Sequence, residues 1–274
     1  HSIWARTSWD NFEVIVIENN STDPETFAYY KEAQQRYDGL RVVTYPKKGF
    51  NFSGINNFGR NYATGDYLLL LNNDVEVQGA DWLTELLRQC AHPGGAAICG
   101  AELIYPDGTL QHAGVVTGLG GYAGHSHKYR QAGGSGYLFR AATVQDFSAV
   151  TGACLLVKAS VWDEVHGLDE KYAVAFNDVD FCLRVRDAGY RIVWTPYAQL
   201  THYESKSRGG DEKDPVKAAR FAAEKQRLHD VHGRDNILND PYYNPNLTLD
   251  REDFSESDDL RNLKEGRVTV RWRE

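Results

Sequence analysis

Methionine is absent from the sequence, and no apolar run approaches the roughly 18 residues that a membrane-spanning helix requires. The chain opens with His1-Ser2-Ile3-Trp4-Ala5-Arg6, which has neither an initiator methionine nor the pattern of a signal peptide. We therefore expect it to be part of a longer protein. Its 274 residues suffice for one large α/β domain with a sizeable core.

Cysteine is also scarce, and the 38 acidic residues outnumber the 30 lysines and arginines. The four cysteines, Cys90, Cys99, Cys154 and Cys182, are widely spaced and form no CxxC pair, which predicts buried free thiols in a reducing cytosol. The formal net charge of −8 argues against a general nucleic-acid-binding protein, which would need a basic surface. An acidic protein that handles a phosphorylated substrate needs local positive charge, and a divalent cation is one source of it.

Strands and helices are predicted to alternate along most of the chain. Short apolar runs between polar turns predict strands, and capping residues followed by helix-forming segments predict helices. Strands are expected at 14–17, 40–45, 67–71, 96–105, 147–158 and 191–194, and helices at 24–37, 55–62, 81–91, 160–165, 178–188 and 215–231. This order predicts right-handed βαβ units in a mostly parallel central sheet flanked by helices.

Two segments lack such a pattern. Residues 114–136 are rich in glycine and contain His125 and His127. They predict a long loop, which is either a mobile lid with the histidines near a substrate or a surface loop with its own packing. We expect a main domain at 1–235 and a polar extension at 236–274 that wraps the surface without forming a second core.

Polar clusters follow two of the predicted strands. Glu18 and Asn20 come after the first visible strand, and Asn72-Asn73-Asp74 follows the leucine-rich strand. Ligands collect at the carboxyl ends of strands in open α/β sheets. An acidic residue there can hold a hard cation together with phosphate oxygens and water. Capping of the next turn is the alternative role for Asp74.

Two more clusters lie toward the C-terminus. Asp178 and Asp180 begin a predicted helix, where carboxylates stabilise the N-terminus and where one of them can serve as a general base. The loop after the last predicted strand contains His202, Lys206 and Arg208. An imidazole is a common metal ligand, and the two cations can bind phosphate oxygens. The alternatives are a structural histidine and two solvated cations.

A set of ordered strings between Phe12 and Gly209 carries a family resemblance. The strings are Phe12 to Asp23, Asn56 to Gly59, Ala63 to Tyr67, Leu71 to Asp74, Gly167 to Glu170, Asn177 to Arg184, Ala188 to Tyr190, and the loop around His202. In this order they resemble family 2 glycosyltransferases with the GT-A fold. The stretches at 105–108, 111–114 and 202–209 resemble bacterial members that build rhamnose-containing or other surface polysaccharides. Members normally begin with a strand and a helix, of which only the helix end, residues 2–8, is visible here.

The resemblance implies a donor-binding site that contains a metal. Asp74 matches the last acidic residue of the family's DxD motif and would bind Mn²⁺ or Mg²⁺, whereas Asn72 replaces the motif's first Asp. His202 matches a histidine that completes the metal site. Glu18 takes the place of an Asp that contacts the nucleobase. Further donor contacts are expected from Asn20, Asn73, Lys206 and Arg208.

The resemblance also implies the reaction. Asp178 matches the catalytic base, with Asn177 in place of the usual Glu and Asp180 as the second candidate. The expected enzyme is cytoplasmic and peripherally associated with the inner membrane face. It would move a sugar, with inversion, from a nucleotide-diphosphate donor to a hydroxyl of a glycan or lipid-linked acceptor, and would bind no nucleic acid.

Two other functions are consistent with parts of the sequence. A non-catalytic GT-A-like module that binds sugar or nucleotide, or that serves in assembly, is favoured by the lost carboxylate at Asn72. The joint presence of Asp74, Asp178 and His202 argues against it, because a binding module needs no base. A nucleotidyltransferase would want a glycine-rich loop with Arg or Lys after its first strand, and the sequence shows no such loop.

Overall fold

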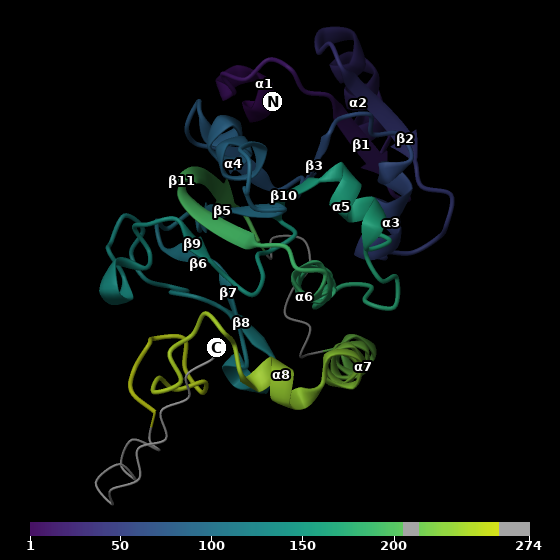
Figure 1. Cartoon of the computed structure of the whole chain (residues 1–274). Coiled ribbons are helices and arrows are strands. Elements are labelled where there is room, and N and C mark those ends of the chain that lie inside the picture. Colours follow the sequence, from purple (N-terminus) through teal and green to yellow (C-terminus); the bar gives the residue numbers. More distant parts are fainter. Residues whose placement is uncertain (205–213, 258–274) are drawn as a thin grey trace, which may run out of the picture.

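The computed structural model describes residues 1–204 and 214–257 and consists of a central sheet with helices on both sides (Figure 1). The helices are α1 (Ser2–Arg6), α2 (Pro24–Arg36), α3 (Phe52–Arg60), α4 (Trp82–Ala91), α5 (Ala159–Glu164), α6 (Asn177–Asp187), α7 (Pro215–His232) and α8 (Arg234–Leu238). The strands are β1 (Val14–Glu18), β2 (Leu40–Thr44), β3 (Tyr67–Leu71), β4 (Val75–Val77), β5 (Ile98–Ile104), β6 (Leu110–His112), β7 (Val115–Thr117), β8 (Ala123–His125), β9 (Gln145–Asp146), β10 (Cys154–Lys158) and β11 (Ile192–His202). The predicted helices are confirmed with small shifts at their ends.

Helix α2 shows why the local predictions succeed. The side chain of Asp23 accepts a hydrogen bond from the backbone N–H of Glu25 at 2.9 Å, and Pro24 occupies the first helical position. Both features satisfy or remove the free N–H groups at a helix start, so they specify the start without any distant contact.

The central sheet is mixed, whereas a mostly parallel one was expected. Its main strand order is β3-β10-β5-β11-β4, with β6 paired to β5 and β9 to β11. Strands β5 and β11 run parallel, but β10 is antiparallel to both of its neighbours. Residues 105–153, which the structure describes in full, contain short strands and 3₁₀ turns but no α-helix. The chain therefore enters β10 without the helical crossover that a parallel neighbour needs. Strands β1 and β2 form a separate parallel pair.

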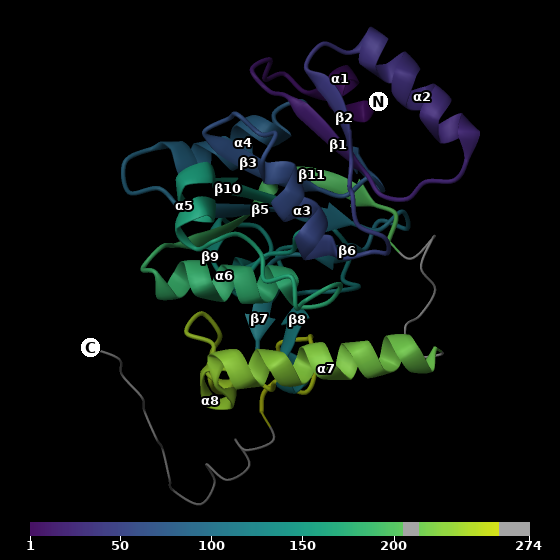
Figure 2. The ribbon, with the colours of Figure 1, turned by 90° about the vertical axis from the view of Figure 1, so that its right-hand side faces the viewer.

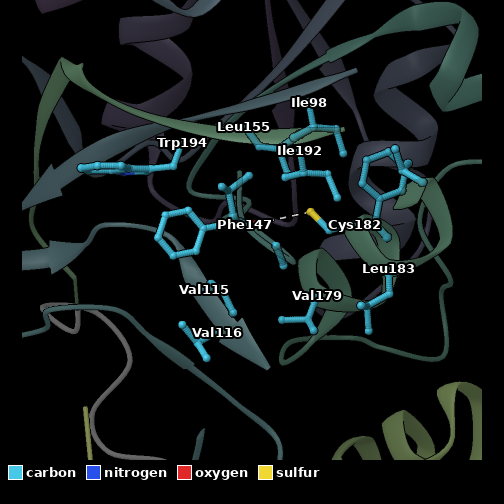
Figure 3. Close-up of a cluster of buried hydrophobic side chains, with 14 of the residues drawn as sticks. Ile98, Val115, Val116, Phe147, Leu155, Val179, Cys182, Leu183, Ile192 and Trp194 are labelled. Carbon is cyan, nitrogen blue, oxygen red and sulfur yellow. Dashed lines mark hydrogen bonds between the residues drawn. The ribbon is translucent and has the colours of Figure 1, made fainter. Parts of the chain in front are cut away.

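Successive residues of the inner strands face opposite layers. On one face of β5, Cys99, Ala101 and Leu103 pack with α4, and on the other face Ile98 packs with α6. Figure 2 shows α4 and α6 on opposite sides of the sheet, with α7 below α6. Figure 3 shows the second layer, in which side chains from the sheet, from β7 and from α6 converge: Ile98, Val115, Val116, Phe147, Leu155, Val179, Cys182, Leu183, Ile192 and Trp194. This packing fixes the position of α6, which begins next to Asp178.

Strand β11 is longer than the sequence predicted. The expected strand end at Thr195-Pro196 is an irregularity inside one continuous element, where the register with β5 shifts between Thr195 and Gln199. A bulge accommodates a proline, which cannot donate a ladder hydrogen bond. The strand therefore continues to His202 and carries that residue to the edge of the sheet where β4 begins.

The glycine-rich segment 114–136 begins with a hairpin, made of β7 and β8 joined by a 3₁₀ turn (Leu119–Gly121), and continues in turns and irregular structure beyond β8. His127 is fully buried, and its Nε2 accepts a hydrogen bond from the N–H of Tyr137 at 3.1 Å. Burial lowers the pKa of His127 to about 4, so this ring is neutral near pH 7. His127 is thus part of the segment's internal packing.

The described part of the C-terminal extension covers this hairpin. Asp240 accepts from the backbone N–H of Thr117 at 2.7 Å, and the ring of Phe254 lies 4.3 Å from that of His127. Tyr243, Leu247 and Phe254 join the main hydrophobic cluster. The described part of the extension therefore contributes side chains to the main core.

The cysteine prediction is confirmed, since Cys90, Cys99, Cys154 and Cys182 are all buried and free. Among the described residues, no helix is both long and apolar enough to cross a membrane.

A buried carboxyl in the sheet should make stability depend on pH. Glu102 on β5 is 2% exposed, and its Oε1 accepts from Gln199 at 2.7 Å. Burial raises the pKa of Glu102 to about 7, from an ordinary value of 4.5. The folded state then binds more protons than the unfolded state between these values, so this group costs stability as the pH rises from about 4.5 to about 7.

We therefore expect Glu102→Gln to stabilise the protein at pH 8 by on the order of 3 kcal/mol and to change little at pH 4. Thermal unfolding of both proteins at the two pH values tests this. An equal effect at both would contradict it.

Candidate active site

The pairing of β4 with β11 brings together Asp74 and His202. In this antiparallel ladder His202 lies opposite Val75, and the N–H of Tyr203 donates to the carbonyl of Asp74 at 2.8 Å. The resulting separation between Asp74 Oδ1 and His202 Nε2 is 3.1 Å. The side chain of Asp74 is partly exposed, whereas that of His202 is buried. One carboxylate oxygen and one imidazole nitrogen therefore meet at the edge of the sheet.

Asn72 completes this cluster from β3. Its side-chain amide nitrogen lies 3.3 Å from His202 Nε2, and its backbone N–H donates to the carbonyl of Ala153 at 3.0 Å. The backbone bond extends the β3–β10 ladder by one step beyond the strand ends. Asn73, the next residue, lies in an exposed turn.

Asp178 is the second residue of α6, which begins directly after a strained residue. Phe176 adopts the left-handed conformation, with φ 59° and ψ 8°, which turns the chain sharply into the helix. Asp178 Oδ2 accepts from the N–H of Gly152 at 2.9 Å, and Oδ1 accepts from the N–H of Val179 at 2.9 Å. Burial raises the pKa of the Asp178 carboxyl, and these two hydrogen bonds offset part of the rise. A partly buried carboxylate with a raised pKa is suited to act as a general base.

Three consecutive residues connect Asp178 to the Asp74–His202 cluster. Gly152 donates to Asp178, while Ala153 accepts from Asn72. The ideal position of a Cβ atom on Gly152 would lie 3.1 Å from the ring of Phe52, so a larger residue would crowd this connection. The segment 151–153 therefore places the two clusters beside each other, and sequence reasoning had assigned it only to a strand.

Asp180, the second candidate base, is in a different environment. It is 1% exposed, and its two oxygens contact Arg184 Nε and His232 Nε2, each at 2.9 Å. Both contacts tie α6 to its own later turns and to α7. The geometry favours Asp178 over Asp180 as the group that meets a substrate.

Two histidines lie behind the segment 151–153. His112 Nε2 accepts from the N–H of Thr151 at 3.4 Å, and the Nδ1 atoms of His112 and His125 are 2.8 Å apart. Burial lowers the pKa of His125 to about 4 and that of His112 well below its usual value, so both rings are neutral near pH 7. Of the two histidines in the glycine-rich segment, His125 is therefore the one near the candidate site.

The predicted nucleotide contacts lie on the β1–β2 sheet. Glu18 ends β1 and is buried, and its Oε1 accepts from the N–H of Ser21 at 2.6 Å. Asn20 is exposed and donates to the carbonyl of Lys47 at 3.2 Å. Lys206 and Arg208 lie outside the described residues.

The donor set at Asp74 and His202 fits a divalent cation. Two neighbouring ligands of an octahedral ion, each at about 2.1 Å, lie about 3 Å apart, close to the 3.1 Å seen here. The described residues bring no third His, Cys, Asp or Glu to this pair. Phosphate oxygens and water would have to fill the remaining positions, as is usual for cations that bind together with a phosphorylated substrate.

A cleft of about 520 Å³ opens near the start of α6. It lies between the β7–β8 turn, α7 and the C-terminal segment, and its lining includes Tyr122, Phe176, Phe221, Lys225 and Glu252. The ammonium of Lys225 lies 4.7 Å from the ring centre of Tyr122 and 4.6 Å from that of Phe221. Aromatic rings and charged groups therefore line this cleft, and one of the rings, that of Phe176, belongs to the residue two positions before Asp178 in the chain.

Comparisons with known proteins identify the family of the chain. Residues 1–141 match the family described as "Glycosyl transferase family 2". The chain is 44% identical over 254 residues to the "Uncharacterized protein y4gI" of Sinorhizobium fredii. This match covers 92% of the chain and 28% of that protein. It is 38% identical over 256 residues to the "O-antigen biosynthesis protein RfbC" of Myxococcus xanthus, covering 92% of this chain and 19% of that protein. The chain thus spans less than a third of either relative.

A solved structure shares the fold. The mannosyltransferase PcManGT from Pyrobaculum calidifontis, solved with GDP-Man and Mn²⁺, superposes with a TM-score of 0.57 at 16% identity. The match covers 86% of this chain and 64% of that one. At this identity the likeness concerns the GT-A architecture alone.

Proposed function

The chain belongs to glycosyltransferase family 2, and from that premise we propose that it transfers a sugar, with inversion, from a nucleotide-diphosphate donor to a hydroxyl group. The proposed acceptor is a glycan or lipid-linked glycan, and the proposed context is bacterial surface polysaccharide synthesis. The name of the Myxococcus relative supports that context. We further propose a location at the cytoplasmic side of the inner membrane.

The observation that carries the proposal is the connection through Gly152 and Ala153. It places Asp178, a carboxylate with a raised pKa, beside the cluster of Asn72, Asp74 and His202. A transferase needs a base on one side of the sugar and charge neutralisation on the other. A module that only binds sugar or nucleotide needs no base at this position, so the arrangement weighs against that alternative.

We assign the following roles to the side chains. Asp178 accepts the proton of the acceptor hydroxyl as the oxygen attacks the anomeric carbon from the face opposite the nucleotide. Asp180 holds α6 in place through Arg184 and His232. Donor contacts are proposed for Glu18, Asn20, Asn72, Asn73, Lys206 and Arg208.

Asp74 and His202 are the proposed ligands of a divalent cation, Mn²⁺ or Mg²⁺. Such an ion, when bound, stabilises the negative charge of a leaving diphosphate. The Mn²⁺ in the structure of the mannosyltransferase from Pyrobaculum calidifontis supports this choice. His202 is fixed by the sheet and Asp74 stays accessible at its edge, so the pair can bind and orient the donor's phosphates.

A nucleotide-sugar screen tests the proposed function. The purified protein is incubated with UDP-, GDP- and dTDP-sugars plus Mn²⁺ or Mg²⁺, and both donor binding and release of the nucleoside diphosphate are measured. Release that rises when glycan acceptors are added supports transfer. Binding without any turnover would favour the non-catalytic module, and neither binding nor turnover would overturn both.

We propose the cleft beside Phe176 as the acceptor site. Its volume lies in the range of about 300–1,000 Å³ that is typical of small-molecule sites. Aromatic rings can pack against the C–H faces of a sugar, while Lys225 and Glu252 can bind its hydroxyl groups. The cleft also borders β8, whose last residue, His125, contacts His112 and through it Thr151. Phe176, which lines the cleft, precedes Asp178 by two residues in the chain, and this supports a place for the acceptor close to the proposed base.

Phe221→Ala should raise the acceptor KM by about tenfold, equivalent to about 1.4 kcal/mol, and leave the donor KM unchanged. The ring of Phe221 forms one wall of the cleft and packs on Phe176 at 5.6 Å between centroids. Val216→Ala, a highly exposed position on the same helix, is the matched control. Steady-state kinetics with both substrates varied provides the measurement. An unchanged acceptor KM would move the acceptor elsewhere.

A further inference from the structure

We propose that Gln111 and Glu204 are positioning residues that fix the ring orientation and tautomer of His202, so that its Nε2 lone pair faces the cation site. This inference rests on the proposed role of His202 as a metal ligand. Sequence reasoning assigned no role to either residue, although Gln111 lies in a string that carries the family resemblance.

The orientation begins at the carboxylate of Glu204. Its Oε2 accepts one hydrogen bond from the hydroxyl of Tyr105 at 2.9 Å and another from the side-chain amide of Gln111 at 3.1 Å. A carboxylate oxygen can accept but not donate. The NH₂ group of Gln111 must therefore point toward Glu204, which leaves its carbonyl Oε1 pointing the other way.

That carbonyl determines the tautomer of His202. Gln111 Oε1 lies 3.1 Å from His202 Nδ1, and a carbonyl can only accept. Nδ1 must then carry the proton, and in the neutral ring Nε2 is left with its lone pair. Gln111 and His202 are 3% and 4% exposed, so water has little access to provide a competing hydrogen bond.

The lone pair of Nε2 faces two groups of different character. The amide of Asn72, 3.3 Å away, can donate to it. Asp74 Oδ1, 3.1 Å away, is an acceptor, as is Nε2 itself. Two acceptors at this distance repel each other unless a positive ion lies between them or a proton is taken up. The hydrogen bonds from Glu204 through Gln111 thus prepare the Asp74–His202 pair for a cation.

The sheet holds these residues in register. Gln111 lies on β6, which pairs with β5, and β5 pairs in turn with β11, which ends at His202. Tyr105 follows the end of β5, and Glu204 follows the end of β11 by two residues. Tyr105, Gln111 and Glu204, which lie behind the Asp74–His202 pair, therefore come from three adjacent strands or their ends. Removal of a hydrogen-bond partner behind a metal ligand typically changes metal affinity by about 10–100-fold.

The test measures Mn²⁺ binding and the histidine tautomer without any sugar donor. Mn²⁺ affinity is determined by electron paramagnetic resonance of the free ion. The His202 tautomer is read from ¹H–¹⁵N spectra of the metal-free protein under mildly alkaline conditions. Gln111→Leu removes the acceptor for Nδ1–H, and we expect Mn²⁺ affinity to fall by about 10–100-fold and the Nδ1–H form to lose its dominance. Gln78→Leu is the matched control, because Gln78 bonds Thr201, the neighbour of His202, at 2.8 Å.

A second set of variants, in which the side chains at 111 and 204 are exchanged, keeps the inference testable if Gln111→Leu does not fold. Gln111→Glu alone places two carboxylates together and should weaken Mn²⁺ binding. Gln111→Glu combined with Glu204→Gln restores an acceptor for His202 Nδ1–H, because the new carboxylate accepts from both Nδ1–H and the new amide. The hydrogen bond between positions 111 and 204 then runs in the opposite direction, and the hydroxyl of Tyr105 can donate or accept as needed. We expect the double variant to bind Mn²⁺ at least ten times more tightly than Gln111→Glu, with the Nδ1–H tautomer recovered.

The outcomes separate this inference from the proposed function. If the wild-type protein binds no Mn²⁺, the proposed metal site fails and the inference fails with it. If the wild type binds Mn²⁺ but Gln111→Leu matches Gln78→Leu in both affinity and tautomer, only the inference is overturned. A double variant that binds no better than Gln111→Glu also overturns it.

Discussion

Replacing Asp178 by asparagine should lower the rate of sugar transfer by about 10²–10⁴-fold while leaving donor binding intact. The amide has nearly the same shape and can still accept the hydrogen bond from Gly152 N–H, which the carboxylate accepts at 2.9 Å. It cannot accept a proton from the acceptor hydroxyl. Single-turnover rates and donor titration of the same preparations separate the two effects.

Two controls identify which carboxylate is the base. Asp187→Asn changes an exposed carboxylate at the other end of α6 and should leave the transfer rate unchanged. Asp180→Asn should lower the melting temperature, because it disturbs buried contacts to Arg184 and His232. Full activity of Asp178→Asn would exclude Asp178 as the base.

The pH dependence of the transfer rate should also identify Asp178 as the base. Burial raises the pKa of Asp178 above the ordinary Asp value of 3.8. A base must be deprotonated to act, so transfer should fall as the pH drops through this raised pKa. The acidic limb of kcat is therefore expected at a higher pH than an ordinary aspartate would give, and it should be missing from the residual activity of Asp178→Asn.

Replacing Asp74 by asparagine should abolish tight Mn²⁺ binding and reduce transfer by roughly 10³-fold, as for the loss of a major electrostatic contribution to a transition state. Asp74 supplies the only formal charge of the Asn72, Asp74 and His202 cluster when His202 is neutral. Its side chain is 36% exposed at the sheet edge, so the substitution should change the melting temperature little. Mn²⁺ titration, donor affinity and melting temperature give the three readouts.

Glu76→Gln is the matched control for Asp74. Glu76 lies two residues further on, and its partners are Arg6 and the hydroxyl of Tyr203. Its substitution should leave Mn²⁺ binding within about twofold of the wild type, a change worth only about 0.4 kcal/mol. Chelation of the metal should stop transfer by the wild-type protein, and added Mn²⁺ should restore it. Unchanged Mn²⁺ affinity of Asp74→Asn would place the cation elsewhere.

Local patterns in the sequence were enough to locate the elements that carry the site. The leucine-rich run specifies β3 and so the place of Asn72 and Asp74 at its end. Asp178 lies in the first turn of α6, as its helix-capping chemistry predicts. These assignments succeed because strand and helix patterns depend on contacts within a few residues.

What the sequence by itself determined, then, is the identity of the chemical groups and the strand or helix end on which each one lies. The tertiary structure alone decided which of them meet. Asp74 and His202 are 128 residues apart, and they become neighbours because β11 continues past a bulge at Pro196 and pairs with β4. The hydrogen-bonded connection from Asn72 through residues 151–153 to Asp178 likewise depends on β10 running antiparallel between β3 and β5. Strand register and order are set by packing and hydrogen bonds between distant segments, so no local pattern of residues contains them.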